Sequence, residues 1–344
     1  MSINIAINGF GRIGRMVFRR ALETNNLNVS AINVSYPIET VAHLIKYDSV
    51  HGRFNKPVNI LDETTLKIGD SIVTLVNSRD PRTLPWKQME IDLVIEATGK
   101  FRTKETAGWH LEAGAKKVII TAPGKDEDQT IVIGVNDSDY EASRHHILSN
   151  ASCTTNCLAP VAKMIDEAFG IENGMMTTVH SFTNDQNNID NPHKDLRRAR
   201  ACGESIIPTS TGAAKALSKV LPNLKGKLTG IALRVPTPNV SLVDLVVDVK
   251  VPVTVEQVNA VLKELAENEY EGIVAFSEEP LVSIDYKTDP HSAIIDGLST
   301  MVLGDRKVKI LAWYDNEWGY SCRVVDLATL VAKKMLEAKD VKAS

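Results

Sequence analysis

Three glycines near the start of the chain, Gly9, Gly11 and Gly14, constrain its fold more than any other feature. They form a G-x-G-x-x-G pattern between a β-rich run at residues 3–7 and a segment with helical periodicity at residues 15–22. Glycines at this spacing permit a tight turn and let a pyrophosphate approach the backbone at the helix N-terminus. This context favours a dinucleotide-binding unit over a merely flexible glycine turn.

Further strand–helix units indicate that this unit belongs to a parallel, doubly wound sheet. The expected strands lie at residues 29–33, 93–99, 117–121, 131–135 and 147–149, with a helix at residues 104–113. Ligands bind such sheets at the carboxyl ends of the strands. We therefore expect the cofactor at that edge.

The second strand ends without the acid that hydrogen-bonds the ribose 2′-hydroxyl of NAD about 20 residues after the glycines. Val34 stands close to that position. A carboxylate there repels a 2′-phosphate, so its absence removes an obstacle to NADP. NAD could still bind with one hydrogen bond fewer.

A second informative stretch surrounds Cys153. Apolar residues recur at helical spacing over residues 158–169, and Ser152 is of an N-cap type, so Cys153 is expected at or just before a helix N-terminus. The helix dipole and free N–H groups there favour a thiolate, which makes Cys153 a candidate nucleophile. The alternative is a small buried hydrophobic residue. His180 could activate the thiol, although a single histidine in a strand is more often structural.

The second half of the chain has strands that are not strictly separated by helices, which indicates a mixed or antiparallel domain. A polar loop at residues 183–203 is long enough to suggest a functional or interfacial role. The expected strands lie at residues 175–182, 229–235, 241–251, 281–285 and 307–314, with helices at residues 255–268 and 320–337.

Composition argues against several classes of protein. A chain of 344 residues predicts two domains, and its net charge of -4 gives no electrostatic reason to bind nucleic acid or an anionic membrane. No apolar run approaches the roughly 20 residues that span a bilayer. Four cysteines do not make a disulfide framework, and no metal-binding motif is present, so we expect a cytoplasmic protein without a metal.

Several blocks together closely resemble the phosphorylating glyceraldehyde-3-phosphate dehydrogenases, and the resemblance covers nearly the whole chain. The blocks are residues 8–15 (NGFGRIGR), 46–49 (KYDS), 149–160 (SNASCTTNCLAP), 210–215 (STGAAK), 234–238 (RVPTP) and 313–320 (WYDNEWGY). The resemblance implies an α/β protein with a Rossmann-type doubly wound parallel sheet and an α+β catalytic domain with a mixed sheet. The implied domains are residues 1–151, with a C-terminal helix at 317–340 packing back on them, and residues 152–316.

The resemblance also implies a reaction. Cys153 attacks the aldehyde of glyceraldehyde 3-phosphate, hydride passes to the nicotinamide, and inorganic phosphate cleaves the thioester to 1,3-bisphosphoglycerate. His180 matches the residue that activates the thiol. Residues matching the two phosphate sites are Ser152, Thr154, Thr183, Arg198, Thr211, Gly212 and Arg234, with Arg197 and Arg200 as alternatives to Arg198. Residues matching cofactor contacts are Gly9, Gly11, Arg12, Ile13, Gly14, Thr98 and Asn316.

Two positions depart from the NAD-using pattern of that family. Val34 replaces an aspartate, and Asn191 stands where leucine is usual. Ser35, Asn191 and Arg79 could then meet a 2′-phosphate, as in the NADP-preferring, biosynthetic branch. The cofactor expected is NADP, with NAD possible.

The polar loop at residues 183–203 resembles a family loop that packs at a tetramer interface, so a homotetramer is expected. Erythrose-4-phosphate dehydrogenase is the alternative within the family. A non-catalytic redox-sensing or binding protein on the same scaffold is the alternative from another class.

Overall fold

The computed structural model describes residues 2–343, which form two compact units. The first unit comprises Met1–Ile131, Asp137–Ala151 and Ser321–Ser344, and the second comprises Val132–Asn136 and Ser152–Tyr320. The chain therefore leaves the first unit, completes the second, and returns to the first with its last helix.

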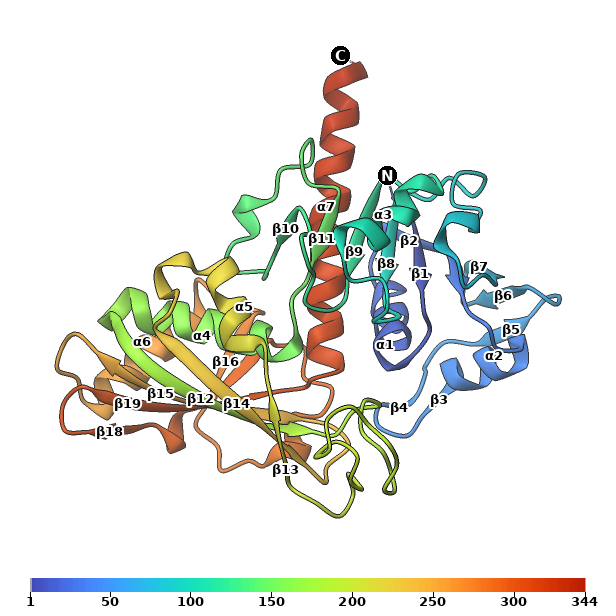
Figure 1. Cartoon of the computed structure of the whole chain (residues 1–344). Helices are drawn as coiled ribbons and strands as arrows, with labels where there is room; N and C mark the ends of the chain where they lie inside the picture. The colour runs from blue at the N-terminus through green and yellow to red at the C-terminus, as the bar shows by residue number, and fades with distance from the viewer. Residues whose placement is uncertain (1, 344) are drawn as a thin grey trace. The chain divides into compact units, whose positions relative to one another are not determined.

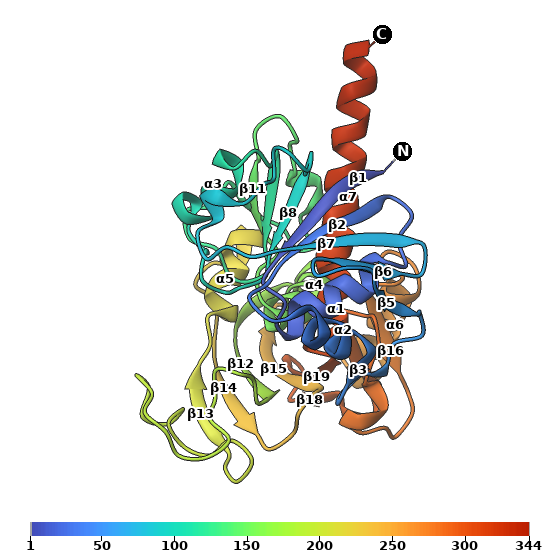
Figure 2. The ribbon, with the colours of Figure 1, turned by 90° about the vertical axis from the view of Figure 1, so that its right-hand side faces the viewer.

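The first unit contains a nine-stranded sheet. Its strands are β1 (Ile3–Asn8), β2 (Leu27–Asn33), β5 (Val58–Ile60), β6 (Thr65–Ile68), β7 (Ser71–Val76), β8 (Leu93–Glu96), β9 (Lys117–Ile120), β10 (Gln129–Thr130) and β11 (Ile147–Ser149). The order is β10-β11-β9-β8-β1-β2-β7-β6-β5, and neighbours are parallel from β10 to β7. Strands β5, β6 and β7 pair antiparallel at one edge. Figure 2 shows β8, β1, β2 and β7 side by side. The expected doubly wound sheet is confirmed.

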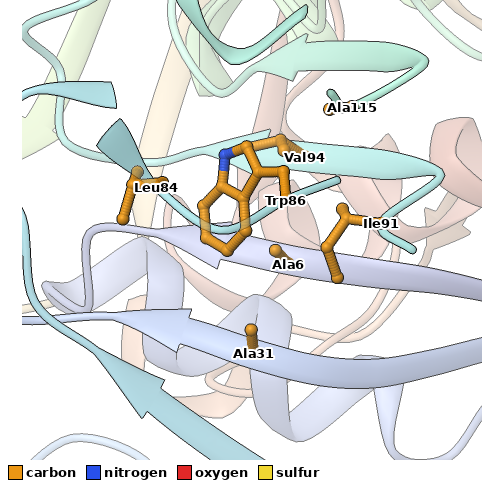
Figure 3. Packing of buried hydrophobic residues seen from close by; sticks show 7 residues of the cluster. All are labelled: Ala6, Ala31, Leu84, Trp86, Ile91, Val94 and Ala115. Carbon is orange, nitrogen blue, oxygen red and sulfur yellow. The ribbon is translucent and has the colours of Figure 1, made fainter. Parts of the chain in front are cut away.

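A tryptophan anchors one core of this unit. Trp86 is fully buried, and Figure 3 shows it above Ala6 of β1 and Ala31 of β2, whose small side chains leave room for the indole. The other elements of the first unit are α1 (Arg12–Ala21), α2 (Ile38–Lys46), α3 (Lys104–Glu112), the two-stranded ribbon of β3 (Tyr47–Asp48) and β4 (Gly52–Arg53), and α7 (Trp318–Ala343), which belongs to this unit from Ser321 onward.

The second unit contains an eight-stranded mixed sheet. Its elements are β12 (Ile171–Ser181), β13 (Ile207–Ser210), β14 (Leu228–Val235), β15 (Ser241–Val249), β16 (Val274–Ser277), β17 (Ala293–Asp296), β18 (Met301–Leu303), β19 (Lys307–Tyr314), α4 (Cys153–Phe169), α5 (Ala213–Val220) and α6 (Val255–Glu267). The order is β13-β14-β12-β15-β19-β17-β16, and β18 pairs with β19. Only β12–β14 and β16–β17 are parallel pairs. Figure 1 shows α4, α5 and α6 along one face of this sheet. The mixed second domain is also confirmed.

Two of the predicted strands are wrong. Residues 131–135 form a turn instead, because Asn136 Oδ1 accepts the Val132 N–H at 2.9 Å and Gly134 has a φ of +82°. Residues Ser283–Tyr286 form a 3-10 helix, whose start is capped by the Asp285 carboxylate accepting the Val282 N–H at 2.9 Å. In both places a polar side chain takes the backbone bond that a strand neighbour would have supplied.

Candidate functional site

Cys153 is the first residue of α4, as the sequence predicted. Ser152 is the N-cap, and its hydroxyl accepts the Thr155 N–H at 3.1 Å. Ala151 just before it has a φ of +54°, a left-handed conformation that is strained for a residue other than glycine. The chain thus turns sharply into the helix, and the half-buried Cys153 thiol sits at its positive end.

His180 lies beside this thiol. Its Nε2 is 3.4 Å from Cys153 Sγ, and β12 holds the ring almost fully buried. Burial, and then the positive charge of Arg234, lower the pKa of His180 to about 3. Burial raises the pKa of the Cys153 thiol, against the lowered value expected from the helix terminus, while Arg234 acts in the opposite direction. Desolvation therefore outweighs the local positive charge in the substrate-free chain.

Arg234 completes a contact chain with these two residues. It is paired with His180 across β12 and β14, and its Nη1 lies 2.7 Å from His180 Nδ1 and donates to the Ser181 carbonyl at 3.0 Å. A guanidinium only donates, so a hydrogen bond from Arg234 to Nδ1 requires the ring proton to be on Nε2, facing the thiol. Nδ1 also lies 2.7 Å from the Ser181 carbonyl, which requires the opposite tautomer. The two contacts of Nδ1 therefore favour different tautomers, and the one with the proton on Nδ1 leaves Nε2 free to accept the proton of the thiol.

Tyr314 supports the same cluster from β19. Its hydroxyl lies 2.9 Å from Thr154 Oγ1 and 2.8 Å from Thr178 Oγ1, and its ring meets His180 edge-on. Burial raises the pKa of Tyr314 well above its usual range, so the hydroxyl stays protonated. Sequence reasoning missed this residue, although it lies within the 313–320 block.

The other residues expected to bind phosphate lie in several different segments of the second unit. The Thr211 hydroxyl accepts the Ala213 N–H at 3.2 Å where α5 begins, and Gly212 is its N-cap. Arg198 forms ion pairs with Asp185 and Asp195, yet its charge still lowers the pKa of His180. Arg197 and Arg200 are exposed, whereas Arg198 is partly buried. The Thr183 N–H donates to Gln186 Oε1 at 3.3 Å.

In the first unit, the glycine turn fits a dinucleotide. A Cβ on Gly14 would lie 2.1 Å from the Gly9 carbonyl oxygen, and Gly9 has a φ of +94°. A Cβ on Gly11 would meet nothing within 4 Å, and no side chain caps α1 there. The turn thus leaves the start of α1 open to an anion. The Ile13 backbone lies in this first turn, and the Thr98 N–H donates to Glu96 Oε1 at 2.8 Å.

Arg12 is engaged within the chain. Its guanidinium forms a two-pronged ion pair with Asp48, whose carboxylate also accepts the N–H groups of Val50 and His51 at 2.9 Å each. These hydrogen bonds hold the pKa of Asp48 well below its usual range, against the effect of burial. The Arg12 side chain therefore fixes the β3–β4 ribbon to α1, while its backbone N–H remains in the first turn of that helix.

The end of β2 carries the expected specificity residues. Val34 is buried and its N–H donates to the Val76 carbonyl at 2.9 Å, whereas Ser35 and Arg79 are exposed. Asn33 just before Val34 bonds the backbone of Ser78, the residue before Arg79. Sequence reasoning missed Asn33, because only an acid was sought at this strand end.

Two expected cofactor residues lie in the second unit. Asn316 is buried, and its Oδ1 accepts the Ser241 hydroxyl at 2.8 Å, which fixes the orientation of its amide. Asn191 is exposed in the segment between β12 and β13, where its N–H donates to the Ala199 carbonyl at 2.9 Å.

Comparison with known proteins matches both halves of the chain. The family model "Glyceraldehyde 3-phosphate dehydrogenase, NAD binding domain" matches residues 3–104, and "Glyceraldehyde 3-phosphate dehydrogenase, C-terminal domain" matches residues 152–316. The chain is 67% identical over 335 residues to glyceraldehyde-3-phosphate dehydrogenase 2 of Bacillus subtilis, covering 97% of this chain and 98% of the relative. It is 59% identical to the proteins of that name in Staphylococcus aureus (strain MRSA252) and Staphylococcus epidermidis, over the full length of both chains in each comparison. Among residues 2–343, no helix combines the length and apolar character needed to cross a bilayer.

Proposed function

This chain belongs to the glyceraldehyde-3-phosphate dehydrogenase family, and from that premise we propose that it interconverts D-glyceraldehyde 3-phosphate and 1,3-bisphosphoglycerate through a thioester on Cys153. The observation that carries this proposal is the 3.4 Å contact between Cys153 Sγ and His180 Nε2 at the start of α4. A thiol with a partner able to take its proton is the arrangement that attack on an aldehyde requires.

In the proposed reaction Cys153 Sγ forms a bond to the aldehyde carbon, and His180 holds the proton that leaves the thiol. The backbone N–H of Cys153 and the His180 ring stabilise the oxyanion of the hemithioacetal. The nicotinamide, when bound, supplies the hydride acceptor. His180 returns its proton to this oxygen, which gives the hemithioacetal hydroxyl, and takes the proton back as the hydride leaves and the thioester forms. Attack by inorganic phosphate then breaks the C–S bond and releases the acyl phosphate and the Cys153 thiolate.

Two anion sites are assigned around this centre. Arg234 and Thr183 bind the substrate phosphate, since a guanidinium recognises phosphate with paired hydrogen bonds. The inorganic-phosphate site is assigned to Ser152, Thr154, Arg198, Thr211 and Gly212. The start of α5 supports this second assignment, because its N-cap Gly212 has no side chain to cap the helix and helix N-termini bind anions.

The dinucleotide is assigned to the domain of residues 1–151, on which the helix at 317–340 packs back, and the substrate is assigned to the domain of residues 152–316. The backbone N–H groups of Arg12 and Ile13 receive the pyrophosphate at the glycine turn of Gly9, Gly11 and Gly14. Thr98 follows the carboxyl end of β8, and the Asn316 amide orients the nicotinamide.

A preference for NADP over NAD is part of the proposal. Support comes from Val34, which offers the ribose no carboxylate, and from exposed Arg79, Ser35 and Asn191, which can bind phosphate oxygens. Replacing Val34 with aspartate restores a hydrogen bond to a charged group, worth roughly 1.5–3 kcal/mol to NAD, and adds repulsion toward NADP.

The cofactor test is kcat/KM for both cofactors in the wild type, Val34→Asp and Val282→Asp, the last being an exposed valine of the second unit that controls for added charge. We expect the wild type to favour NADP, Val34→Asp to shift the ratio toward NAD by tenfold or more, and Val282→Asp to leave it unchanged. A wild type that favours NAD would rule out the preference.

A homotetramer is also proposed. Met175 of β12 and Ile231 of β14 lie exposed on the sheet face opposite buried Met176 and His180, and Ile189 and Leu196 are exposed in the segment between β12 and β13. Apolar side chains on a sheet face are typical of subunit contacts. Sedimentation of the wild type and of Met175→Glu tests this assembly.

The four unpaired cysteines fit the reducing cytoplasm in which we expect this protein.

The activity test compares glyceraldehyde 3-phosphate with erythrose 4-phosphate, in both directions and with and without inorganic phosphate. We expect the triose phosphate to be preferred, turnover to require phosphate, and a thioester to be trapped on Cys153 by mass spectrometry. Full turnover by Cys153→Ser would overturn the thioester, and a preference for erythrose 4-phosphate would move the chain to the alternative activity.

A further inference from the structure

The side chain of Asn33 holds a peptide of a neighbouring segment at the end of β2. Its Nδ2 donates to the Ser78 carbonyl at 2.8 Å, and its Oδ1 accepts the Ser78 N–H at 2.9 Å. Both backbone polar groups of Ser78 are thus bound by one buried amide. The residue that follows is Arg79, so Asn33 sets where the backbone of Arg79 begins.

The orientation of the Asn33 amide is itself fixed by buried neighbours. Asn33 Nδ2 also donates to Asn8 Oδ1 at 2.6 Å, and Asn8 Nδ2 donates to the Glu96 carboxylate. Asn8 cannot flip, because its oxygen would then face that carboxylate. The Asn33 amide nitrogen must therefore point toward Asn8, which leaves its oxygen for the Ser78 N–H.

The same network is anchored in the core of the first unit. Trp86 Nε1 donates to His110 Nδ1 at 3.0 Å, and an indole N–H can only donate, so Nδ1 is the accepting nitrogen of the ring. His110 Nε2 then donates to Glu96 at 2.9 Å. Trp86 is packed among the side chains of Figure 3, so the network that orients Asn33 rests on a rigid cluster.

Arg79 is free to act on an external anion. It is exposed and forms no ion pair within the described part of the chain. The adjacent Asp80 is occupied by Arg82, whose Nε and Nη2 donate to its carboxylate at 3.0 and 2.8 Å. On the β2 side, the Val34 N–H binds the Val76 carbonyl, so the two chain segments run together up to this point.

We propose that Asn33 is the positioning residue for cofactor discrimination: it holds the Ser78–Arg79 segment against the end of β2, so that the Arg79 guanidinium reaches a ribose 2′-phosphate beside Val34. This rests on the proposed preference for NADP. Asn33 itself touches no phosphate. Because Asn33 already orders the Ser78–Arg79 segment, NADP binding does not have to supply the free energy of ordering it.

The test is the dissociation constants of NADP and NAD, measured by fluorescence titration without substrate. The variants are Asn33→Ala, Arg79→Ala and the double variant. The control is Asn28→Ala, an exposed asparagine of the same strand whose amide donates to Asn4 and Ser30.

We expect Asn33→Ala to weaken NADP binding by about tenfold and NAD binding by much less, with Asn28→Ala unchanged. In the Arg79→Ala background, Asn33→Ala should cause no further change in the NADP/NAD ratio, because both changes remove the same interaction. Hydrogen exchange should show loss of protection at the Ser78 amide. If Asn33→Ala does not fold, Asn33→Ser takes its place in the same titrations.

An unchanged ratio in Asn33→Ala, an equal loss for both cofactors, or full additivity with Arg79→Ala would overturn the inference. These outcomes are separable from failure of the proposed preference. A wild type without NADP preference, unaffected by Arg79→Ala, refutes the preference and the inference together. A wild type whose preference is lost in Arg79→Ala but kept in Asn33→Ala refutes only the role of Asn33.

Discussion

Replacing Arg234 with alanine tests the substrate-phosphate site most directly. The guanidinium is mostly buried and contacts His180 Nδ1 and the Ser181 carbonyl, so it is held where β12 and β14 pair beside Cys153. A charge-assisted hydrogen bond to phosphate contributes roughly 1.5–3 kcal/mol. We therefore expect KM for glyceraldehyde 3-phosphate to rise roughly ten- to 150-fold, with kcat at saturation much less affected.

A second effect of the same substitution follows from the charge. Because Arg234 helps to lower the pKa of His180, its removal should raise that pKa toward the ordinary value, as NMR titration of the ring can measure. Arg234→Lys keeps the charge and should restore the low pKa, but should recover KM only in part because an ammonium lacks the paired donors of a guanidinium.

The assay is steady-state kinetics with varied triose phosphate, using Arg306→Ala, an exposed arginine of the same unit, as the control for loss of one positive charge. An unchanged KM for the triose phosphate in Arg234→Ala would refute the phosphate assignment. A lower kcat with normal KM would show that Arg234 acts through His180 alone.

Three further predictions concern the same unit. Iodoacetamide should alkylate Cys153 before Cys157, which is fully buried and whose pKa burial raises well above its usual value; peptide mass spectrometry showing Cys157 modified first would contradict this. The folded-state pKa of His180, about 3, lies below its ordinary value near 6.5, so the unfolded chain binds the proton first and stability should fall as the pH drops from about 6.5 toward 3. Urea unfolding at pH 7, 5 and 4 should show this loss reduced in His180→Asn. Tyr314→Phe removes two buried hydrogen bonds and should lower the free energy of unfolding by about 1–3 kcal/mol. Tyr270→Phe should cost little, since that hydroxyl has no partner among the described residues.

Local patterns predicted the elements that carry the chemistry. The glycine turn between β1 and α1, the helix beginning at Cys153 and the strand bearing His180 each have a signal within about fifteen neighbouring residues. Apolar periodicity and cap-type residues act over that range, because they record which face of an element is buried and where its backbone lacks partners.

Contacts between distant residues could not be predicted in this way. The ion pair of Arg12 with Asp48 and the bonds of Asn33 to Ser78 join residues 36 and 45 positions apart, and no local pattern marks them. The sequence also did not predict that the pKa of Cys153 is raised. It depends on how deeply the folded chain buries the thiol, which the residues around it do not reveal.

The division of the chain into units has a consequence for its synthesis. The chain leaves the first unit after Ala151 and returns to it only at Ser321. From there α7 contributes buried side chains such as Val324, Leu327 and Val331 to this unit. A ribosome adds about 5–20 residues per second, so roughly ten to thirty seconds pass between these two points. During that interval the nascent first unit lacks the helix that covers part of its core. We expect it to be the more vulnerable half to chaperone capture and aggregation until translation ends.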